Sequence, residues 1–323
     1  MSEVLRVEGL KMYYKMGKLY VKAVDDVTFT VEKGTCLGLA GESGSGKTSI
    51  ANTIMRLLPR NAQILSGKIY IDGQNVLDLS EEEFRRIRWV KIAMVPQASM
   101  NAFDPVFTIG DQIAEAIITH RRVSKEEAMN RVRELFDLVG IDPKRVNSYP
   151  HEFSGGMKQR AAIAMALANN PDVLILDEPT TALDVIVQAQ VLSLLRDLKK
   201  KLNIGMMLIT HDLSIIADLC DKVAIFYAGK VVEYGNIYRI YENPLHPYTK
   251  GLLGAFPNIR AKRQRLVGIP GAPPNLASPP SGCRFHPRCP YAFDKCKVEE
   301  PKMKEVEPGH FVACHLYDGE RNA

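Results

Sequence analysis

The sequence predicts an α/β fold in which buried parallel strands alternate with helices. Two continuous apolar runs, Pro171–Leu176 and Gly205–Thr210, are typical of central strands that are covered on both faces. A third run, Thr35–Ala40, leads into Gly41–Thr48, a glycine-rich loop that fits the pattern G-x-x-x-x-G-K-[ST]. A helical apolar pattern follows each run, so strands and helices alternate around the loop as in a nucleotide-binding core.

The N-terminal part of the chain predicts an antiparallel β portion. Short β-like runs occur at Val4–Val7 and Val27–Val31, and a loop at Lys15–Lys18 separates them. Ser66–Gly73 is typical of a further strand that ends in an Asp-Gly turn. Ile92–Pro96 is typical of a buried strand that ends at the proline.

A helical insertion is predicted over about residues 98–160, between two of the buried strands. Apolar residues at Ile109, Ile113 and Ile117 recur at the spacing of one helix face, and the pattern extends through Thr108–Val139. The strand pattern returns only at Pro171–Leu176.

The composition changes after about residue 259. Gly268–Pro274 and Ser278–Pro280 are rich in proline, glycine and serine, which indicates an extended, turn-rich connection. We therefore predict a first domain over residues 1–258 and a C-terminal extension over 259–323.

Composition excludes several classes of protein. Of the 323 residues, 46% are apolar and 24% are charged, which is ordinary for a globular chain with a sizeable core. The longest apolar run, Ala161–Ala168, is too short to cross a bilayer, and no secretory signal opens the chain, so we expect a cytoplasmic protein. The net charge of +5 is modest. We expect the basic cluster Arg260–Arg265 to be a solvated surface segment, and we expect no nucleic acid as a partner.

The glycine-rich loop is predicted to bind phosphate groups. Its glycines let backbone N–H groups turn inward toward anionic oxygens at the positive end of a helix. Lys47 would place a point charge on the β- and γ-phosphates, and the hydroxyl of Thr48 is a suitable ligand for Mg²⁺. The nucleotide-binding candidates in and beside this loop are Gly41, Glu42, Ser43, Gly44, Ser45, Gly46, Lys47, Thr48 and Ser49.

Polar side chains follow three of the buried strands. Asp177 ends the strand Val173–Leu176 and is placed to hold Mg²⁺ through water, while Glu178 can orient and deprotonate an attacking water. Gln97 follows another strand, and its amide can contact Mg²⁺ or the water. His211 follows a third, where an imidazole N–H can donate to a γ-phosphate. Glu178, His211 and Gln97 are the catalytic candidates.

A second anion site is predicted in Phe153–Arg160. Ser154, Gly155 and Gly156 precede a helix that begins near Met157, so their backbone N–H groups are available to a phosphate. This stretch resembles the Leu-Ser-Gly-Gly-Gln signature of the ATP-binding cassette (ABC) ATPases.

The resemblance covers about residues 3–255, and the motifs stand in the order of that family. They are Tyr14, Gly41–Thr48, Gln97, Ser154–Met157, Asp177–Glu178, Asp184 and His211. It implies a RecA-like core, stacking of adenine on Tyr14, and ATP and Mg²⁺ as cofactors. It also implies that ATP is hydrolysed at two composite sites, each using the phosphate loop of one subunit and the signature of another, so that an isolated chain is nearly inactive.

Three further stretches resemble the dipeptide/oligopeptide importers. Phe153 and Met157 depart from the commonest signature toward the variant of one importer subunit, and His246–Leu253 and Gly282–Pro290 resemble the importers' C-terminal extension. The resemblance implies an ATP-hydrolysing subunit at the cytoplasmic face of the membrane. It would pair with a second, homologous ATPase subunit as a heterodimer, contact two transmembrane permease subunits, and serve an extracytoplasmic substrate-binding protein indirectly. An oligosaccharide or nickel importer and a soluble ABC protein without a transport role are the alternatives.

Four cysteines gather near the C-terminus, namely Cys283, Cys289, Cys296 and Cys314. Four thiolates suit Zn²⁺ or an iron–sulfur cluster, and the importer resemblance implies a [4Fe–4S] cluster that clips the extension together. The histidines His286, His310 and His315 are alternative ligands. We expect a structural role, with redox regulation of the ATPase as the alternative, and we expect loss of the metal to leave the distant phosphate loop able to bind ATP.

Overall fold

The computed structural model describes residues 2–255 and 268–319, which form two compact units. Unit 1 consists of Met1–Arg6, Thr30–Cys36 and Ile69–Ile209, and unit 2 consists of Val7–Phe29, Leu37–Lys68 and Thr210–Ala323. Each unit is assembled from distant parts of the sequence, and the tail beyond residue 268 belongs to the same unit as the glycine-rich loop. The basic cluster Arg260–Arg265 lies outside the described residues.

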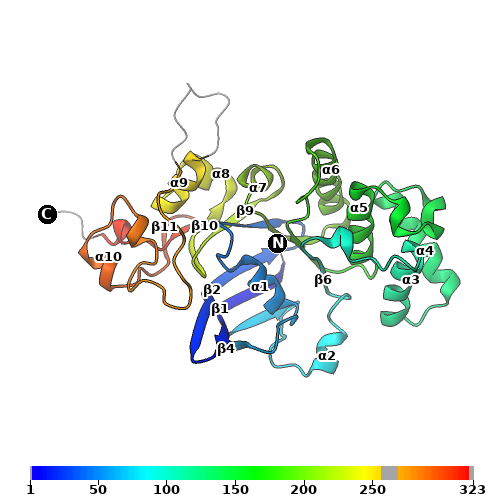
Figure 1. Ribbon diagram of the computed structural model, residues 1–323, viewed down its shortest axis with the longest axis horizontal. Helices are drawn as coiled ribbons and strands as arrows, with labels where there is room; N and C mark the ends of the chain where they lie inside the picture. Colours follow the sequence, from blue (N-terminus) through cyan, green and yellow to red (C-terminus); the bar gives the residue numbers. More distant parts are fainter. Residues whose placement is uncertain (1, 256–267, 320–323) are drawn as a thin grey trace. The chain divides into compact units, whose positions relative to one another are not determined.

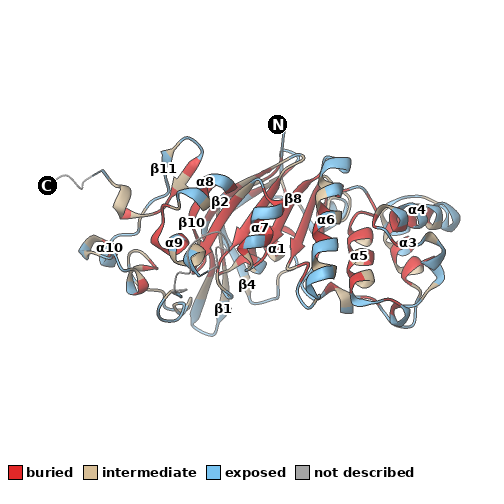
Figure 2. Cartoon of the chain, turned by 90° about the horizontal axis from the view of Figure 1, so that it is seen from above, coloured by how far each residue is buried: buried red, intermediate tan, exposed pale blue. Residues whose placement is uncertain are grey.

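Unit 1 contains a parallel sheet in which β7 (Val173–Asp177) pairs with β6 (Ile92–Val95) on one side and β8 (Gly205–Ile209) on the other. Every residue of these strands is buried, as the red β8 illustrates in Figure 2. The predicted two-sided burial of the apolar runs is therefore confirmed, and β6 ends directly before Pro96.

The helical part of unit 1 lies where the periodicity predicts it. Helix α3 (Ile109–His120) begins after the Thr108 cap and buries its isoleucines, and α4 (Lys125–Leu138) begins at a Ser124 capping box. Both helices contact α5 (Gly155–Ala166), as Figure 1 shows. The remaining elements of this unit are β5 (Gln74–Asn75), α2 (Glu81–Arg85), η1 (Ser99–Asn101), η2 (Pro143–Asn147), η3 (Pro150–Glu152) and α6 (Val185–Leu202).

Unit 2 contains a mixed sheet that the C-terminal tail extends. Strand β3 (Cys36–Ala40) pairs in parallel with β9 (Lys222–Tyr227), which pairs antiparallel with β10 (Lys230–Asn236). Beyond β10 follow β12 (His310–Val312) and β11 (Lys304–Glu307), both antiparallel. An apolar pattern does not predict the strands β11 and β12, because both are short and β11 is largely exposed.

The helices of unit 2 are short. Helix α1 (Lys47–Ile54) ends shortly before Arg56, which adopts a left-handed conformation with φ of 52°. The others are α7 (Leu213–Leu219), α8 (Ile237–Glu242), α9 (Pro247–Gly254), η4 (His286–Arg288), α10 (Asp294–Val298) and η5 (His315–Tyr317). None of the helices in the described ranges is long and apolar enough to cross a membrane.

The N-terminal strands are longer than the predicted runs. They are β1 (Glu3–Met16), β2 (Leu19–Glu32) and β4 (Ala62–Ile71), and each contributes residues to both units. The predicted loop is the turn at Gly17–Lys18, and the predicted Asp-Gly turn joins β4 to β5. Partly exposed strands accept lysine, tyrosine and threonine on the outer face, so their full length is hidden from a search for apolar residues.

Candidate nucleotide site

The glycine-rich loop of unit 2 has a backbone that only glycine accommodates at two positions. Gly41 and Gly46 have φ angles of 148° and 105°. A Cβ atom at Gly41 would lie 2.1 Å from the carbonyl oxygen of Phe226, and one at Gly46 would lie 2.0 Å from that of Ala23. The loop is therefore fixed by close backbone contact with neighbouring strands, which holds its N–H groups in a constant arrangement.

Lys47 is the first residue of α1 and is 6% exposed. Its Nζ donates to the carbonyl oxygens of Gly41 at 2.7 Å and Glu42 at 2.9 Å, and to the Ser45 hydroxyl at 3.2 Å. The ammonium is thus held within the concavity of the loop, where its positive charge would attract a bound phosphate most strongly. Thr48, the next residue of α1, is exposed.

The structure distinguishes Tyr14 from its neighbour Tyr13. The Tyr14 hydroxyl donates to Ser49 Oγ, in α1, at 3.1 Å. Tyr13 instead donates to Asp25 at 2.8 Å, and burial is the main reason why its pKa is raised. Adjacent residues of a strand face opposite sides, so Tyr14 is the ring associated with the phosphate loop.

Unit 1 brings Gln97 and Glu178 together. Asp177 ends β7 and is fully buried, and Glu178 follows it with φ of 48°, a left-handed conformation that is rare outside glycine. The N–H of Glu178 donates to the carbonyl of Ile209 at 2.9 Å. One carboxylate oxygen of Glu178 accepts from Gln97 Nε2 at 3.2 Å and from Thr181 Oγ1 at 2.9 Å. The carboxylate is therefore oriented by two side chains.

The signature stretch caps a helix, as predicted. Ser154 precedes α5, and its Oγ accepts from the N–H of Met157 at 3.3 Å. Asp184 caps α6 in the same way by accepting from Val187 at 3.0 Å, and a Cβ at Gly156 would lie 2.4 Å from Val187 Cγ1. The caps of α5 and α6 therefore pack together, while Ser154 and Gly155 stay exposed.

A buried hydrogen bond joins the segment after Gln97 to the signature helix. Ser99 Oγ donates to Gln159 Oε1 at 2.8 Å, and both residues are almost fully buried. Sequence reasoning missed this pair because Ser99 belongs to no motif and Gln159 carries no assigned role within the signature stretch Phe153–Arg160. His211, in unit 2, is exposed directly after β8. The catalytic role assigned to His211 stays a prediction, as do those of Gln97 and Glu178.

The predicted metal clip at the four cysteines is not present as a formed site. The described residues contain no group of three or more histidine, cysteine, aspartate or glutamate side chains arranged to hold a metal ion. Burial, together with the charges of neighbouring thiols, raises the pKa of Cys283 to about 11 and that of Cys314 to about 12. The N–H of Cys283 donates to the carbonyl of Cys296 at 2.9 Å. The backbones of Cys283 and Cys296 are therefore joined, but the four thiols are not in a ligating arrangement.

Two of the alternative histidine ligands are engaged elsewhere. His310 Nε2 lies 2.7 Å from the buried carboxylate of Glu233, and His315 lies 2.6 Å from Asp318 through Nδ1 and 2.8 Å from the Glu299 carbonyl through Nε2. These contacts fix β12 and η5 within unit 2. Sequence reasoning also missed Arg288, which forms a bidentate ion pair with Glu42 of the glycine-rich loop.

Comparison with known proteins decides the family. Residues 24–181 match the ABC transporter family, and residues 232–296 match the oligopeptide/dipeptide transporter C-terminal region. The chain is 44% identical to the dipeptide transport ATP-binding protein DppD of Caldanaerobacter subterraneus over 98% of each chain. The chain belongs to the ABC transporter family.

Other relatives of this ABC protein agree with that assignment. It is 43% identical to the oligopeptide transport ATP-binding protein OppD of Escherichia coli, over 96% of this chain and 92% of that one. The structure resembles the dimeric ATP-binding cassette MJ0796 bound to ADP and Pi, with a TM-score of 0.65 and 29% identity over 72% of this chain and 98% of that one. The predicted ABC ATPase fold is confirmed.

Proposed function

We propose that this ABC protein is the ATP-binding and ATP-hydrolysing subunit that powers an importer of dipeptides or oligopeptides. The observation that carries the proposal is the combination of a complete set of nucleotide motifs with the oligopeptide/dipeptide C-terminal region at residues 232–296. Relatives similar over nearly the whole chain are named as dipeptide and oligopeptide transport ATP-binding proteins.

In this proposal the residues divide the chemistry between them. The loop N–H groups and Lys47 bind the β- and γ-phosphates, and Glu178 accepts the proton of the attacking water while Gln97 orients it. Thr48 and, through water, Asp177 would hold Mg²⁺, which neutralises phosphate charge when bound. The hydrogen bonds from Gln97 and Thr181 to Glu178 support this assignment because they fix the carboxylate's direction.

A second ATPase subunit is proposed to cover the exposed end of α5 and α6. Ser154 and Gly155 are exposed beside Val185 and Ile186, two apolar residues that are 82% and 72% exposed. Burial of these side chains against a partner would stabilise the complex, because it removes apolar surface from water. The same contact would bring the signature to the γ-phosphate that the partner binds. The Met157 variant of the signature favours a heterodimer.

Co-purification tests the partnership. A tagged chain expressed with its native neighbours should bring down a second, similar ATPase together with two permeases. A fully active complex that contains two copies of this chain and the permeases, with no other ATPase, would contradict the heterodimer.

A groove on the helical part of unit 1 is proposed to receive a short helix from a permease, which would keep the chain at the cytoplasmic face of the membrane. The groove has a volume of about 260 Å³. It is lined by Trp89, Gln112, Glu115, Ala116, Thr119, His120 and Met165. Gln112 also donates to the carbonyl of Phe107, so the groove adjoins a segment in which Val106 and Phe107 are 69% and 56% exposed. Exposed apolar side chains next to a groove suit a helical partner.

Transport in vesicles tests the function itself. The reconstituted complex should hydrolyse ATP faster when the substrate-binding protein is loaded with a peptide, and labelled peptide should accumulate inside vesicles of the matching orientation. If an oligosaccharide or a nickel complex stimulates hydrolysis instead, the transported substrate belongs to that class and not to the peptides. ATPase activity with no transport of any of them would favour the soluble ABC alternative.

The four C-terminal cysteines are proposed to bind a [4Fe–4S] cluster, with Zn²⁺ as the alternative. The support is chemical: the chain places four thiols within residues 283–314, and the N–H of Cys283 donates to the carbonyl of Cys296. Protein purified without oxygen should then be brown and carry about four irons and four labile sulfides. Colourless protein with one zinc would replace the cluster by zinc, and metal-free protein with an ordered tail would overturn both.

A further inference from the structure

Residues 283–296, which carry three of the four C-terminal cysteines, are called the cysteine segment. Arg288, which directly precedes Cys289, extends from this segment to the phosphate loop. Its guanidinium donates to both carboxylate oxygens of Glu42, at 2.8 Å and 2.9 Å. Its Nε donates to the carbonyl of Pro270 at 2.8 Å, and the residue is 8% exposed. The ion pair with Glu42 raises the pKa of Arg288 above its ordinary value, so the guanidinium is always charged. Two parallel bonds fix the direction of the carboxylate as well as its distance.

Glu42 is held at each of its polar groups. Its N–H donates to the Tyr248 hydroxyl at 2.9 Å, its carbonyl accepts from Lys47 Nζ at 2.9 Å, and its carboxylate accepts from Arg288. Because Lys47 contacts the backbone of the same residue that Arg288 holds, a shift of Glu42 would displace the ammonium that the bound phosphates need.

An aromatic cluster gives these contacts a rigid base. The ring centroids of Tyr227 and Tyr248 lie 4.6 Å apart, and Phe285 packs against them at 5.1 Å and 5.4 Å. All three side chains are almost fully buried. Phe285 belongs to the cysteine segment, so the segment packs directly on the tyrosine that holds the Glu42 N–H.

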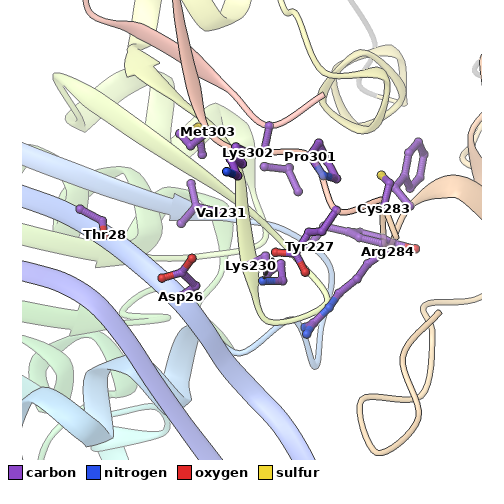
Figure 3. A pocket seen from close by; sticks show the side chains of 14 residues that line it. Asp26, Thr28, Tyr227, Lys230, Val231, Cys283, Arg284, Pro301, Lys302 and Met303 are labelled. Carbon is purple, nitrogen blue, oxygen red and sulfur yellow. Dashed lines mark ion pairs between the residues drawn. The ribbon is translucent and has the colours of Figure 1, made fainter. Parts of the chain in front are cut away.

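Arg284 acts on the loop indirectly, through the turn between β9 and β10. It donates to the carbonyl of Ala228 and to the carboxylate of Asp25. The N–H of the next residue, Gly229, donates to the carbonyl of Ser45 in the loop at 2.9 Å. Figure 3 shows Arg284 extending from the segment toward the turn between β9 and β10, beside a cavity of about 390 Å³. Arg288 therefore contacts the loop directly, whereas Arg284 contacts the turn whose Gly229 hydrogen-bonds to Ser45 of the loop.

We propose that Arg288 is a positioning residue for nucleotide binding, so that the folded cysteine segment sets the affinity of the phosphate loop for ATP. The proposal rests on the proposed ATPase function of this loop. By holding the Glu42 carboxylate, Arg288 keeps in place the Glu42 carbonyl that accepts from Lys47 Nζ, so the ammonium stays where the bound phosphates need it.

Equilibrium binding of MgATP to the full chain tests the proposal. Arg288→Met should weaken binding about tenfold, the usual size of a lost charge-assisted contact. Arg288→Lys keeps the positive charge but cannot form two parallel hydrogen bonds to the carboxylate. Its affinity for MgATP should therefore lie between that of Arg288→Met and that of the wild type. Glu42→Gln should weaken binding by a similar factor, because it loses the orientation by Arg288. The double variant Glu42→Gln with Arg288→Met should bind no more weakly than the worse single variant.

Arg239→Met is the matched control. Arg239 lies 3.6 Å from Glu307 in the same unit and carries no role at the loop, so this variant should bind MgATP as the wild type does. In the assembled transporter, Arg288→Met should raise KM for ATP and leave kcat within about twofold, since saturating ATP restores the geometry of the bound state. A general loss of structure would lower kcat as well.

Two results would overturn the inference. One is wild-type affinity in Arg288→Met or in Glu42→Gln; the second variant leaves the cysteine segment untouched and decides the case if Arg288→Met does not fold. The other is strict additivity in the double variant. A wild-type chain that binds no MgATP at all would instead contradict the proposed function.

Discussion

The two units differ in the kind of chemistry that they carry. Unit 2 holds the phosphate loop, in which Lys47 is fixed by backbone carbonyls and glycines have no room for a side chain. Unit 1 holds Glu178, whose carboxylate is fixed by the side chains of Gln97 and Thr181. The residues proposed to contact the ground-state phosphates therefore belong to one unit and the proposed base to the other. Substitutions should accordingly separate nucleotide binding from turnover.

The largest expected effect is on turnover, from unit 1. Glu178→Gln keeps the size of the side chain but cannot accept the proton of the water, so phosphate release from the assembled complex should fall at least about a hundredfold. MgATP binding should be retained, and the closed dimer should accumulate. Glu126→Gln, at an exposed position of α4, is the control and should be fully active. Steady-state phosphate release near the wild-type rate would remove Glu178 from the role of base.

The next effect is on binding, from unit 2. Lys47→Ala removes a charge from the bound phosphates in both the ground state and the transition state, so the affinity for MgATP should fall by about tenfold to a hundredfold. Isothermal titration of the isolated chain measures it. Lys201→Ala, at the exposed end of α6, controls for the loss of a positive charge. Unchanged affinity in Lys47→Ala would mean that the loop does not bind the phosphates through this residue.

A third effect concerns the stability of unit 2 at acidic pH. His246 caps α9 by accepting from the Tyr248 N–H at 3.0 Å, and burial lowers its pKa from 6.5 to about 4, although Glu233 opposes that shift. The unfolded state therefore binds a proton that the folded state excludes between those values. The resulting stability is complete above pH 6.5 and is lost as pH falls toward 4.

Denaturant unfolding at pH 7 and pH 5 measures this effect. The free energy of unfolding of the wild type should decrease by about 2 kcal/mol more than that of His246→Asn, in which an uncharged cap replaces the imidazole. His151→Asn, at an exposed position of unit 1, should behave as the wild type. Equal pH dependence in the wild type and His246→Asn would show that His246 is not the responsible group.

The smallest expected effect lies again in unit 1. Thr181→Val removes the 2.9 Å hydrogen bond to Glu178 and leaves Gln97 in place, so kcat should fall several-fold and the affinity for MgATP should be unchanged. Steady-state phosphate release and equilibrium binding on the same preparation measure both. A change in affinity without a change in kcat would contradict the separation of the two units.

The sequence predicts those parts of the site in which the backbone conformation or the helix cap lies within the motif itself. Gly41 and Gly46 adopt positive φ angles of 148° and 105° within the loop itself, and Ser154 and Asp184 cap the helices that they precede. A motif therefore locates such residues without knowledge of the rest of the fold. The apolar strands are predictable for a similar reason, because two-sided burial leaves no polar position.

The contacts of the tail could not be predicted in this way. Distance along the chain predicts that the cysteine segment and the phosphate loop are independent, whereas Arg288 lies within hydrogen-bond distance of Glu42. The pairing of β12 with β10 was likewise missed, because it depends on a long-range register and not on local apolar pattern. The same limit applies to the four cysteines: their number suggests a metal site, but their spacing does not determine where the sulfur atoms lie.

The most direct test of the account compares the isolated chain with the assembled transporter at saturating MgATP. Unit 2 contains the phosphate loop, so the isolated chain should bind MgATP. Hydrolysis should appear only when a second ATPase supplies its signature, and phosphate release per chain should rise at least about a hundredfold on assembly with that subunit and the permeases. An isolated monomer that hydrolyses ATP at the assembled rate would contradict the account.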